Sequence, residues 1–339
     1  MQTFEALLAQ VSTQPYSDLH LVCGQVPLLR TQGGLHAFAA GEKVTPQALA
    51  DFRSQVLEAS QLARYELQGD ADAGLSFNGQ RFRLNFFKAS SGDGCAFRRL
   101  SDRIPSMDAL RLPQALRASL QLDKGLVLVT GPTGSGKSTT LASLIDEINR
   151  TRALHILTLE DPIEYLHPSQ RCLVTQRQMG RDAVSFAEGL RAALREDPDI
   201  ILVGEMRDPE TISLALTAAE TGHLVFASLH TRDTSSAISR ILDSMPVDQQ
   251  RQARNQLSES LEMVVTQELH PCLDGVKRVA SFEVLVATIA VRNLIREDKL
   301  FEIPSVLQTG KRAGMQTMQA SRQDLEREGL LAPNVAEQK

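Results

Sequence analysis

The chain has 339 residues, which is longer than one typical domain, so two or three domains are expected. Its net charge of -5 argues against a broad nucleic-acid-binding surface. The four cysteines are far apart and form no C-x-x-C pair, which argues against a zinc ribbon or a dithiol redox site. No stretch approaches about 18 consecutive apolar residues, so no membrane-spanning helix is predicted.

Residues 1–100 have the pattern of a small α+β domain. A short strand is predicted at 17–22, after a helix, and a second helix is predicted at 46–60 with Thr45 as its N-cap. Asn78-Gly79 separates two strand-like runs, which is typical of a β-hairpin. Residues 101–123 contain two prolines and are predicted to be a linker with one short helix.

Arginines alternate with apolar residues in the second arm of this hairpin. Arg81 and Arg83 fall on one face of the predicted strand, and Phe82 and Leu84 fall on the other. Arg98 lies in a further short strand. Two interpretations stay open: these arginines form a solvated face, or some of them reach a nucleotide held by a neighbouring subunit.

A glycine-rich stretch at 131–138 fits the pattern G-x-x-x-x-G-K-[S/T]. It lies between an apolar run, Leu126–Val129, and a segment at 139–149 with apolar residues at helical spacing. In such a loop, backbone N–H groups and the helix N-terminus hold phosphate oxygens. Lys137 would reach the β- and γ-phosphates of ATP, and the Ser138 hydroxyl would bind Mg²⁺. The predicted nucleotide-binding residues are Gly131, Pro132, Thr133, Gly134, Ser135, Gly136, Lys137, Ser138 and Thr139.

Four apolar strands, at 126–130, 155–159, 200–203 and 224–229, alternate with helical segments. This alternation predicts an α/β fold with a parallel sheet that helices cover on both faces. Reactive polar residues follow each strand directly. Because ligands of open α/β sheets bind at the carboxyl ends of the strands, the four segments are expected to meet at one site.

Carboxylates follow two of these strands. Glu205 comes after the strand at 200–203 and is predicted to orient and polarise the water that attacks ATP, with Gly204 leaving room beside the phosphates. The stretch 160–164 places three carboxylates at another strand end. Glu160 and Glu164 are the preferred pair for holding metal-bound water or placing the attacking water.

Two histidines bracket the strand at 224–229. His230, at its carboxyl end, is the candidate sensor of the γ-phosphate. Seven residues of extended chain span roughly 23 Å, so His223 and His230 are not expected to touch the same phosphate. His223 is interpreted as a structural residue or one that faces a neighbouring subunit. No cluster of histidines and cysteines indicates a metal site.

Beyond about residue 246 the chain is predicted to be mainly helical. The segment 248–269 places apolar residues on one helical face, and a strand is possible at 281–286. Further helices are predicted at 290–296 and 315–329.

Four segments together resemble the secretion and type IV pilus ATPases. GPTGSGKSTT (131–140), ILTLEDPIEY (156–165), LREDPDIILVGEMRDPETI (194–212) and TGHLVFASLHT (221–231) are similar to the Walker A motif, Asp box, Walker B motif and His box of that family. The similarity is greatest to the PilT-type retraction ATPases and covers nearly the whole chain. Residues 290–297 resemble the helix motif that is linked to retraction in that family.

The resemblance implies a homohexamer with a PAS-like N-terminal domain at 1–100 and a RecA-like ATPase domain at 124–339. Nucleotide would bind between the two domains and meet arginines of the N-terminal domain, for which Arg81, Arg83 and Arg98 are candidates. Ser90-Ser91-Gly92 stands where the family often has an arginine, so the set of arginines differs from the usual one.

The predicted function is therefore that of a cytoplasmic ATP hydrolase, associated peripherally with the inner membrane, that drives retraction of a type IV pilus and so twitching motility. Its expected partners are an inner-membrane platform protein and, as a possibility, related pilus ATPases, whereas no nucleic acid is expected. The alternatives are a pilus-assembly or type II secretion ATPase of the same superfamily, a regulatory switch that hardly hydrolyses ATP, and a nucleic-acid translocase. The tetracysteine metal insertion that is usual in assembly and secretion ATPases is missing, which favours the retraction branch.

Overall fold

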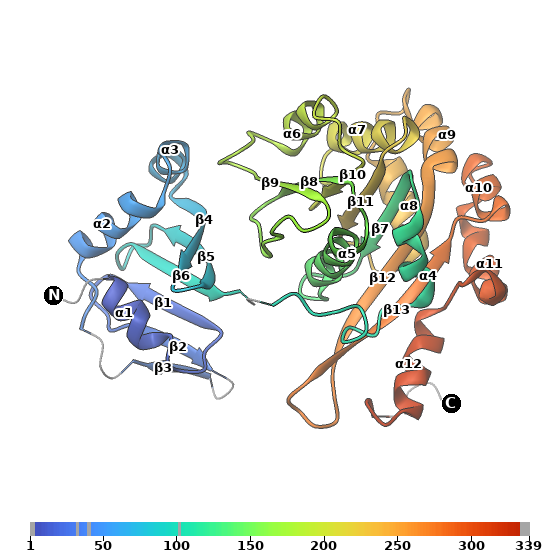
Figure 1. Ribbon diagram of the computed structural model, residues 1–339. Helices are drawn as coiled ribbons and strands as arrows, with labels where there is room; N and C mark the ends of the chain where they lie inside the picture. Colours follow the sequence, from blue (N-terminus) through green and yellow to red (C-terminus); the bar gives the residue numbers. More distant parts are fainter. Residues whose placement is uncertain (1–3, 32–33, 39–41, 101–102, 333–339) are drawn as a thin grey trace. The chain divides into compact units, whose positions relative to one another are not determined.

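The computed structural model of the chain describes residues 4–31, 34–38, 42–100 and 103–332 (Figure 1). The chain divides into two compact units. The first consists of Met1–Arg103 together with two short segments from later in the chain, Asp161–Leu166 and Gln178–Val184. The second consists of Ile104–Glu160, His167–Arg177 and Ser185–Lys339. The predicted linker at 101–123 falls partly on positions 101 and 102, which lie outside the described residues.

The first unit is built on an antiparallel sheet with the strand order β3-β2-β1-β6-β5-β4. Helices α1, α2 and α3 accompany this sheet in the described residues, so the predicted α+β character is confirmed. The elements are α1 (Phe4–Val11), β1 (Asp18–Val22), β2 (Leu28–Thr31), β3 (Gly34–Ala37), α2 (Pro46–Val56), α3 (Ala59–Gln68), β4 (Asp70–Phe77), β5 (Gln80–Phe87) and β6 (Gly94–Arg99).

Local sequence signals set several of these boundaries. The Thr45 side chain accepts a hydrogen bond from the backbone N–H of Ala48 and so caps α2, as predicted. The predicted helix at 46–60 is in fact two helices, because α2 ends at Val56 and α3 begins at Ala59. The hairpin between β4 and β5 turns at Asn78 and Gly79, whose φ angles of 48° and 78° suit a tight two-residue turn.

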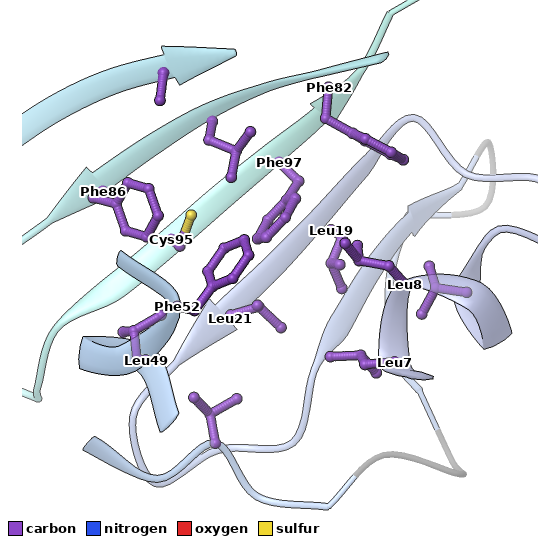
Figure 2. Close-up of a cluster of buried hydrophobic side chains, with 14 of the residues drawn as sticks. Leu7, Leu8, Leu19, Leu21, Leu49, Phe52, Phe82, Phe86, Cys95 and Phe97 are labelled. Atoms are coloured by element: carbon purple, nitrogen blue, oxygen red, sulfur yellow. The ribbon is translucent and has the colours of Figure 1, made fainter. Parts of the chain in front are cut away.

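Aromatic side chains form the centre of the first unit's core. Phe52 of α2 stacks on Phe97 of β6, with ring centroids 5.6 Å apart, and lies 5.8 Å from the ring of Phe86 on β5. Figure 2 shows these rings together with Leu7 and Leu8 of α1 and with Leu19 of β1, which belong to the same cluster of buried side chains. Along β5 buried and half-buried residues alternate, so the arginine and phenylalanine faces are those predicted from the sequence.

The second unit is built on a mainly parallel sheet. Its strands are β7 (Gly125–Thr130), β8 (His155–Glu160), β9 (Leu173–Gln178), β10 (Ile200–Val203), β11 (Leu224–Leu229), β12 (Leu261–Pro271) and β13 (Arg278–Val286). Its helices are α4 (Gln114–Ala118), α5 (Lys137–Thr151), α6 (Phe186–Ala193), α7 (Pro209–Glu220), α8 (Thr234–Asp243), α9 (Gln250–Ser260), α10 (Ile289–Arg296), α11 (Ile303–Thr309) and α12 (Met318–Arg327). Short 3₁₀ turns occur at Ser119–Gln121, Leu300–Glu302 and Gly310–Ala313.

The strand order in this sheet is β13-β12-β7-β11-β10-β8-β9. Strands β12, β7, β11, β10 and β8 pair in parallel, which confirms the parallel arrangement predicted for the four apolar strands. Every residue of β7, β10 and β11 is buried. Helix α5 packs on β7, α6 on β8, and α7 on both β7 and β11, so the carboxyl ends of the parallel strands lie at one edge of a covered sheet.

The prediction of a helix over 248–269 is wrong in its second half. Helix α9 ends at Ser260, and the chain then continues as β12, which pairs in parallel with β7 and antiparallel with β13 (Figure 1). Most of the amino-terminal part of β12 is buried, so its apolar residues form a nearly continuous run rather than an alternating one. A nearly continuous apolar run also contains apolar residues at helical spacing. The sequence pattern of β12 therefore predicted a helix.

The remaining C-terminal elements are close to the prediction. The strand expected at 281–286 is the second half of β13. The helices expected at 290–296 and 315–329 are α10 and α12. The C-terminal part of the chain is therefore helical apart from the β12–β13 ribbon, which is longer than the one strand that the sequence predicted there.

Candidate nucleotide site

The phosphate loop connects β7 to α5 and owes its shape to glycines. Gly131, Gly134 and Gly136 have φ angles of 141°, 82° and 91°, which side chains rarely allow. At Gly131 a Cβ atom would lie only 2.3 Å from the backbone oxygen of Gln267. A loop that follows this path next to β12 therefore requires glycine at its first position.

The start of α5 offers groups that fit a phosphate. The N-cap is Gly136, which has no side chain to bond the first-turn N–H groups of this 15-residue helix. The Ser135 hydroxyl is buried and has no hydrogen-bond partner among the described residues, whereas Ser138 is exposed in the first turn. These donors, together with the helix dipole, suit the oxygens of a nucleotide's phosphate chain.

Lys137 lies at the centre of the site and is only 8% exposed. Its ammonium group donates to the backbone oxygens of Gly131, at 2.9 Å, and Pro132, at 3.2 Å. It also lies 3.3 Å from Nδ1 of His230. An ammonium can only donate, so Nδ1 of His230 accepts, and the ring proton is therefore assigned to Nε2.

His230 and Glu205 continue this chain of contacts. Nε2 of His230 lies 3.1 Å from Oε1 of Glu205, so the ring donates to the carboxylate. The other carboxylate oxygen accepts from Arg207 at 2.6 Å. The structure thus brings together three of the predicted site residues, Lys137, Glu205 and His230, and adds Arg207, to which the sequence analysis gave no role.

The environment keeps Glu205 ionised. Burial raises the pKa of its carboxyl, but the hydrogen bond and charge of Arg207, together with His230, lower the pKa more, so the net pKa lies below its ordinary value. An ionised carboxylate is the form that a general base needs. Each carboxylate oxygen accepts one of these hydrogen bonds and keeps a second lone-pair site, so the carboxylate can still accept from a water.

Gly204 precedes this carboxylate at a point where two strands approach closely. A Cβ atom at this position would lie 3.0 Å from the backbone oxygen of Leu159 and 3.4 Å from Cα of Glu160. Glycine here thus allows the end of β10 to lie against the end of β8, a reason different from the room for phosphates that the sequence suggested.

The two carboxylates preferred in the stretch 160–164 belong to different compact units. Glu160 stays with the ATPase sheet, where its Oε1 accepts from the Thr158 hydroxyl at 2.7 Å and from the Gln176 amide at 3.1 Å. Glu164 belongs to the segment Asp161–Leu166 of the first unit. Their use as a pair stays a prediction.

The N-terminal arginines have partners within the first unit. Arg81 donates to the backbone oxygen of Ile163 at 3.1 Å, so β5 holds the loop that follows β8. Arg83 lies 3.7 Å from a carboxylate oxygen of Asp72. Arg98 donates to Asp18 at 2.9 Å and is largely exposed. The two interpretations of these arginines both stay open.

His223 lies at the amino end of β11, as expected. Its Nδ1 lies 3.0 Å from the backbone oxygen of Ala218, at the end of α7. At the same edge of the sheet, Asp199 accepts from the backbone N–H of His155 and joins the start of β10 to the start of β8. These contacts give both residues a structural place away from the carboxyl ends.

Gln267 of β12 contacts the phosphate loop, and the sequence analysis missed it. This side chain is 1% exposed, its amide N–H donates to the backbone oxygen of Ser135, and its Oε1 accepts from the Thr140 hydroxyl at 2.8 Å. The neighbouring Thr266 hydroxyl lies 2.7 Å from that of Thr130. The β-branched run Val264-Val265-Thr266 was the signal that could have identified a strand here.

A phosphate loop on a mainly parallel sheet, with an ionised carboxylate at a neighbouring strand end, is the arrangement of RecA-like P-loop ATP hydrolases. Residues 36–325 match the model of the family described as "Type II/IV secretion system protein". The chain belongs to this family.

Two relatives and one solved structure show where in the family the chain falls. It is 47% identical to the "Twitching motility protein" of Neisseria gonorrhoeae, over 91% of this chain and 83% of that protein. It is 45% identical to the "Type IV pilus retractation ATPase PilT" of Pseudomonas aeruginosa, over 98% of this chain and 96% of that protein. The crystal structure of the pilus retraction motor PilT with bound ADP is 40% identical, superposes with a TM-score of 0.89 and matches 99% of both chains. The similarity is thus to PilT-type ATPases along nearly the whole chain.

Among the helices in the part of the chain that the structure describes, none is long and apolar enough to cross a membrane.

Proposed function

We propose that this chain is the hexameric ATPase motor that hydrolyses ATP to drive retraction of a type IV pilus. The support from relatives is the 45% identity, over 98% of this chain, to a protein named as a pilus retraction ATPase. The observation that carries the proposal is the unbroken line of contacts from Lys137 through His230 to Glu205. This line connects the group that binds phosphate to the group that can activate water.

ATP is held, in this proposal, by the phosphate loop and the first turn of α5. The Lys137 ammonium leaves the backbone oxygens of Gly131 and Pro132 and turns to the β- and γ-phosphates. The Ser138 hydroxyl, which is exposed in the first turn of α5, would hold Mg²⁺. When bound, Mg²⁺ neutralises the charge of the phosphate oxygens.

Glu205 is the general base of the proposal, and His230 reports on the phosphate. When Lys137 turns to the phosphates, Nδ1 of His230 loses its donor, and the hydrogen bond from Nε2 to Glu205 can shift. The other oxygen of Glu205 accepts from Arg207, and both oxygens keep a lone-pair site that can face water. Weakening of the bond from His230 makes Glu205 a stronger base, so the base responds to the arrival of ATP.

The loop after β8 is the proposed route from this site to the N-terminal sheet. Residues 161–166 follow Glu160 directly in the chain, and Arg81 holds their backbone at Ile163. Glu164 lies in this loop, so its role in placing water stays part of the proposal. The motor acts on the pilus through an inner-membrane platform protein, from the cytoplasmic side, and as a ring in which N-terminal arginines can reach a neighbour's nucleotide.

The test is deletion of the gene in its host, with surface pili and twitching scored. A strain with excess pili and no twitching is the expected result, because pili would still assemble but would not retract. A strain without pili would instead identify an assembly ATPase and would overturn the proposal.

Complementation separates the enzyme from the protein as a scaffold. The parental gene is expected to restore twitching, and a Lys137→Ala gene is expected not to, because the protein would neither bind nor hydrolyse ATP. Restoration of twitching by Lys137→Ala at the parental level would show that ATP turnover by this chain does not drive retraction.

A further inference from the structure

The β12–β13 ribbon carries two polar side chains that reach loops of the ATP site. Gln267 extends from β12 to the phosphate loop, and Glu283 extends from β13 to the chain that follows His230. The polar atoms of both side chains bond to other parts of the protein, so neither side chain is assigned to bind a phosphate.

Gln267 holds the phosphate loop from outside. Its amide N–H group bonds the backbone oxygen of Ser135, and its amide oxygen accepts from Thr140 in the first turn of α5. Its own backbone oxygen packs against Gly131 at the start of the loop. A single buried residue therefore contacts the start and the middle of the loop and the first turn of α5. This bond pairs the Ser135 carbonyl oxygen with a donor from β12.

Glu283 holds the start of α8. Its Oε1 accepts from both the backbone N–H and the hydroxyl of Thr234, each at 2.9 Å. Thr234 is buried and lies four residues after His230. The carboxylate thus fixes the far end of the short loop that carries His230.

Gln267 and Glu283 belong to adjacent residue pairs of the β12–β13 pairing. In the pairing of β12 with β13, Gln267 is opposite Phe282 and Thr266 is opposite Glu283. Strand β12 is also paired with β7, and the hydroxyls of Thr266 and Thr130 are in contact. The register of a hydrogen-bonded strand pair can change only by whole residues. The ribbon therefore fixes the position of the phosphate loop relative to the His230 loop.

We propose that Gln267 positions the phosphate loop and Glu283 positions the His230 loop, so that the β12–β13 ribbon sets the two halves of the ATP site against each other. This inference rests on the proposed ATPase function. The two residues are positioning residues and not catalytic ones, and they affect different steps. Gln267 controls how tightly nucleotide binds, and Glu283 controls how well His230 and Glu205 respond once it is bound.

The first test replaces Gln267 with methionine, which keeps the length of the side chain and removes both hydrogen bonds. In the full-length protein, the Kd for a fluorescent ADP analogue with Mg²⁺ is expected to rise about tenfold or more, and KM for ATP is expected to rise with it while kcat changes less. The matched control is Gln256→Met on α9, where the amide bonds Glu220 and the Kd is expected to stay at the parental value.

The second test is Glu283→Gln, which keeps the shape and weakens the bonds to Thr234. Here kcat is expected to fall about tenfold, with the Kd for the ADP analogue within twofold of the parental value. Thermal melting without nucleotide accompanies both variants, because a residue with a merely structural role would lower the melting temperature and leave the Kd and kcat of the folded protein unchanged.

The proposal depends on whether the two variants change different quantities, the Kd in Gln267→Met and the kcat in Glu283→Gln. A Kd within twofold of the parental value in Gln267→Met, or an equal loss of affinity in both variants, would overturn it. Failure of the parental protein to bind the ADP analogue at all would instead contradict the proposed ATPase function, so the two failures are distinguishable.

Discussion

Replacement of Glu205 by glutamine separates the chemistry of the site from its stability. The carboxylate accepts from Nε2 of His230 at 3.1 Å and from Arg207 at 2.6 Å. A glutamine can keep the first bond through its amide oxygen, but its NH₂ group would face the Arg207 guanidinium, and both groups are donors. The Arg207 side chain is 66% exposed and can turn to solvent, so the lost pair costs about 1 kcal/mol or less.

The effect on turnover is expected to be far larger than the effect on folding. Removing a general base lowers kcat by about 100-fold to 10,000-fold, or about 3 to 5 kcal/mol in the activation free energy. Affinity for ATP should change little, because the nucleotide is held by Lys137 and the phosphate loop. The assay compares phosphate release under single-turnover conditions with the binding of a fluorescent ATP analogue and with urea unfolding.

Two matched variants control for the loss of another carboxylate of the predicted site. Glu160→Gln is expected to lower kcat only modestly, because Thr158 and Gln176 both donate to Oε1 of this carboxylate and give it a structural role. Glu164→Gln tests the second carboxylate of the same stretch. Hydrolysis by Glu205→Gln at the parental rate, or a larger loss in either control, would refute the assignment of Glu205 as the base.

Three further predictions test the loop, a buried histidine and the N-terminal core. Gly131→Ala should destabilise the fold by about 2 kcal/mol or more, because its Cβ would lie 2.3 Å from a backbone oxygen of β12; Gly134→Ala, with open space around its Cβ, should cost less in urea unfolding. Burial lowers the pKa of His167 to about 4. The neutral imidazole therefore contributes about 3 kcal/mol to the free energy of unfolding above pH 6.5, and this contribution is lost as the pH falls toward 4. His167→Gln should flatten the pH dependence of stability between these two pH values. Phe52→Ala should cost about 3 to 5 kcal/mol, whereas Leu67→Ala, at an 85% exposed position, should cost less than about 0.5 kcal/mol.

The clearest sequence predictions concerned segments whose structure depends on nearby residues. The strand, glycine loop and helix around Lys137 were expected from contiguous residues and are present, as is the hairpin turn at Asn78-Gly79. The four parallel strands were also expected, because each is a short apolar run between helical patterns. In such segments, the backbone conformation and the burial can be predicted from short motifs and from the spacing of apolar residues.

The secondary-structure prediction was wrong where a strand is so buried that its apolar and polar residues no longer alternate. Strand β12 was expected to continue the helix before it, and with that error the contact from Gln267 to the phosphate loop could not be foreseen. The sequence also did not indicate that the stretch 160–164 divides between the two units. Glu160 and Glu164 follow one strand in the sequence, but Glu164 packs with the N-terminal unit, and no local pattern indicates where a loop will pack.

By itself, the sequence determined that this chain has a phosphate loop, a parallel sheet and a carboxylate after a buried strand, because these features follow from residue type and short-range spacing. Only the tertiary structure decided that Lys137, His230 and Glu205 form one line of contacts, and that Arg207 covers the carboxylate. The physical reason is that contacts between residues 93 and 25 positions apart depend on the order in which strands assemble. Strand order is a property of the whole sheet, and no single stretch of sequence contains it.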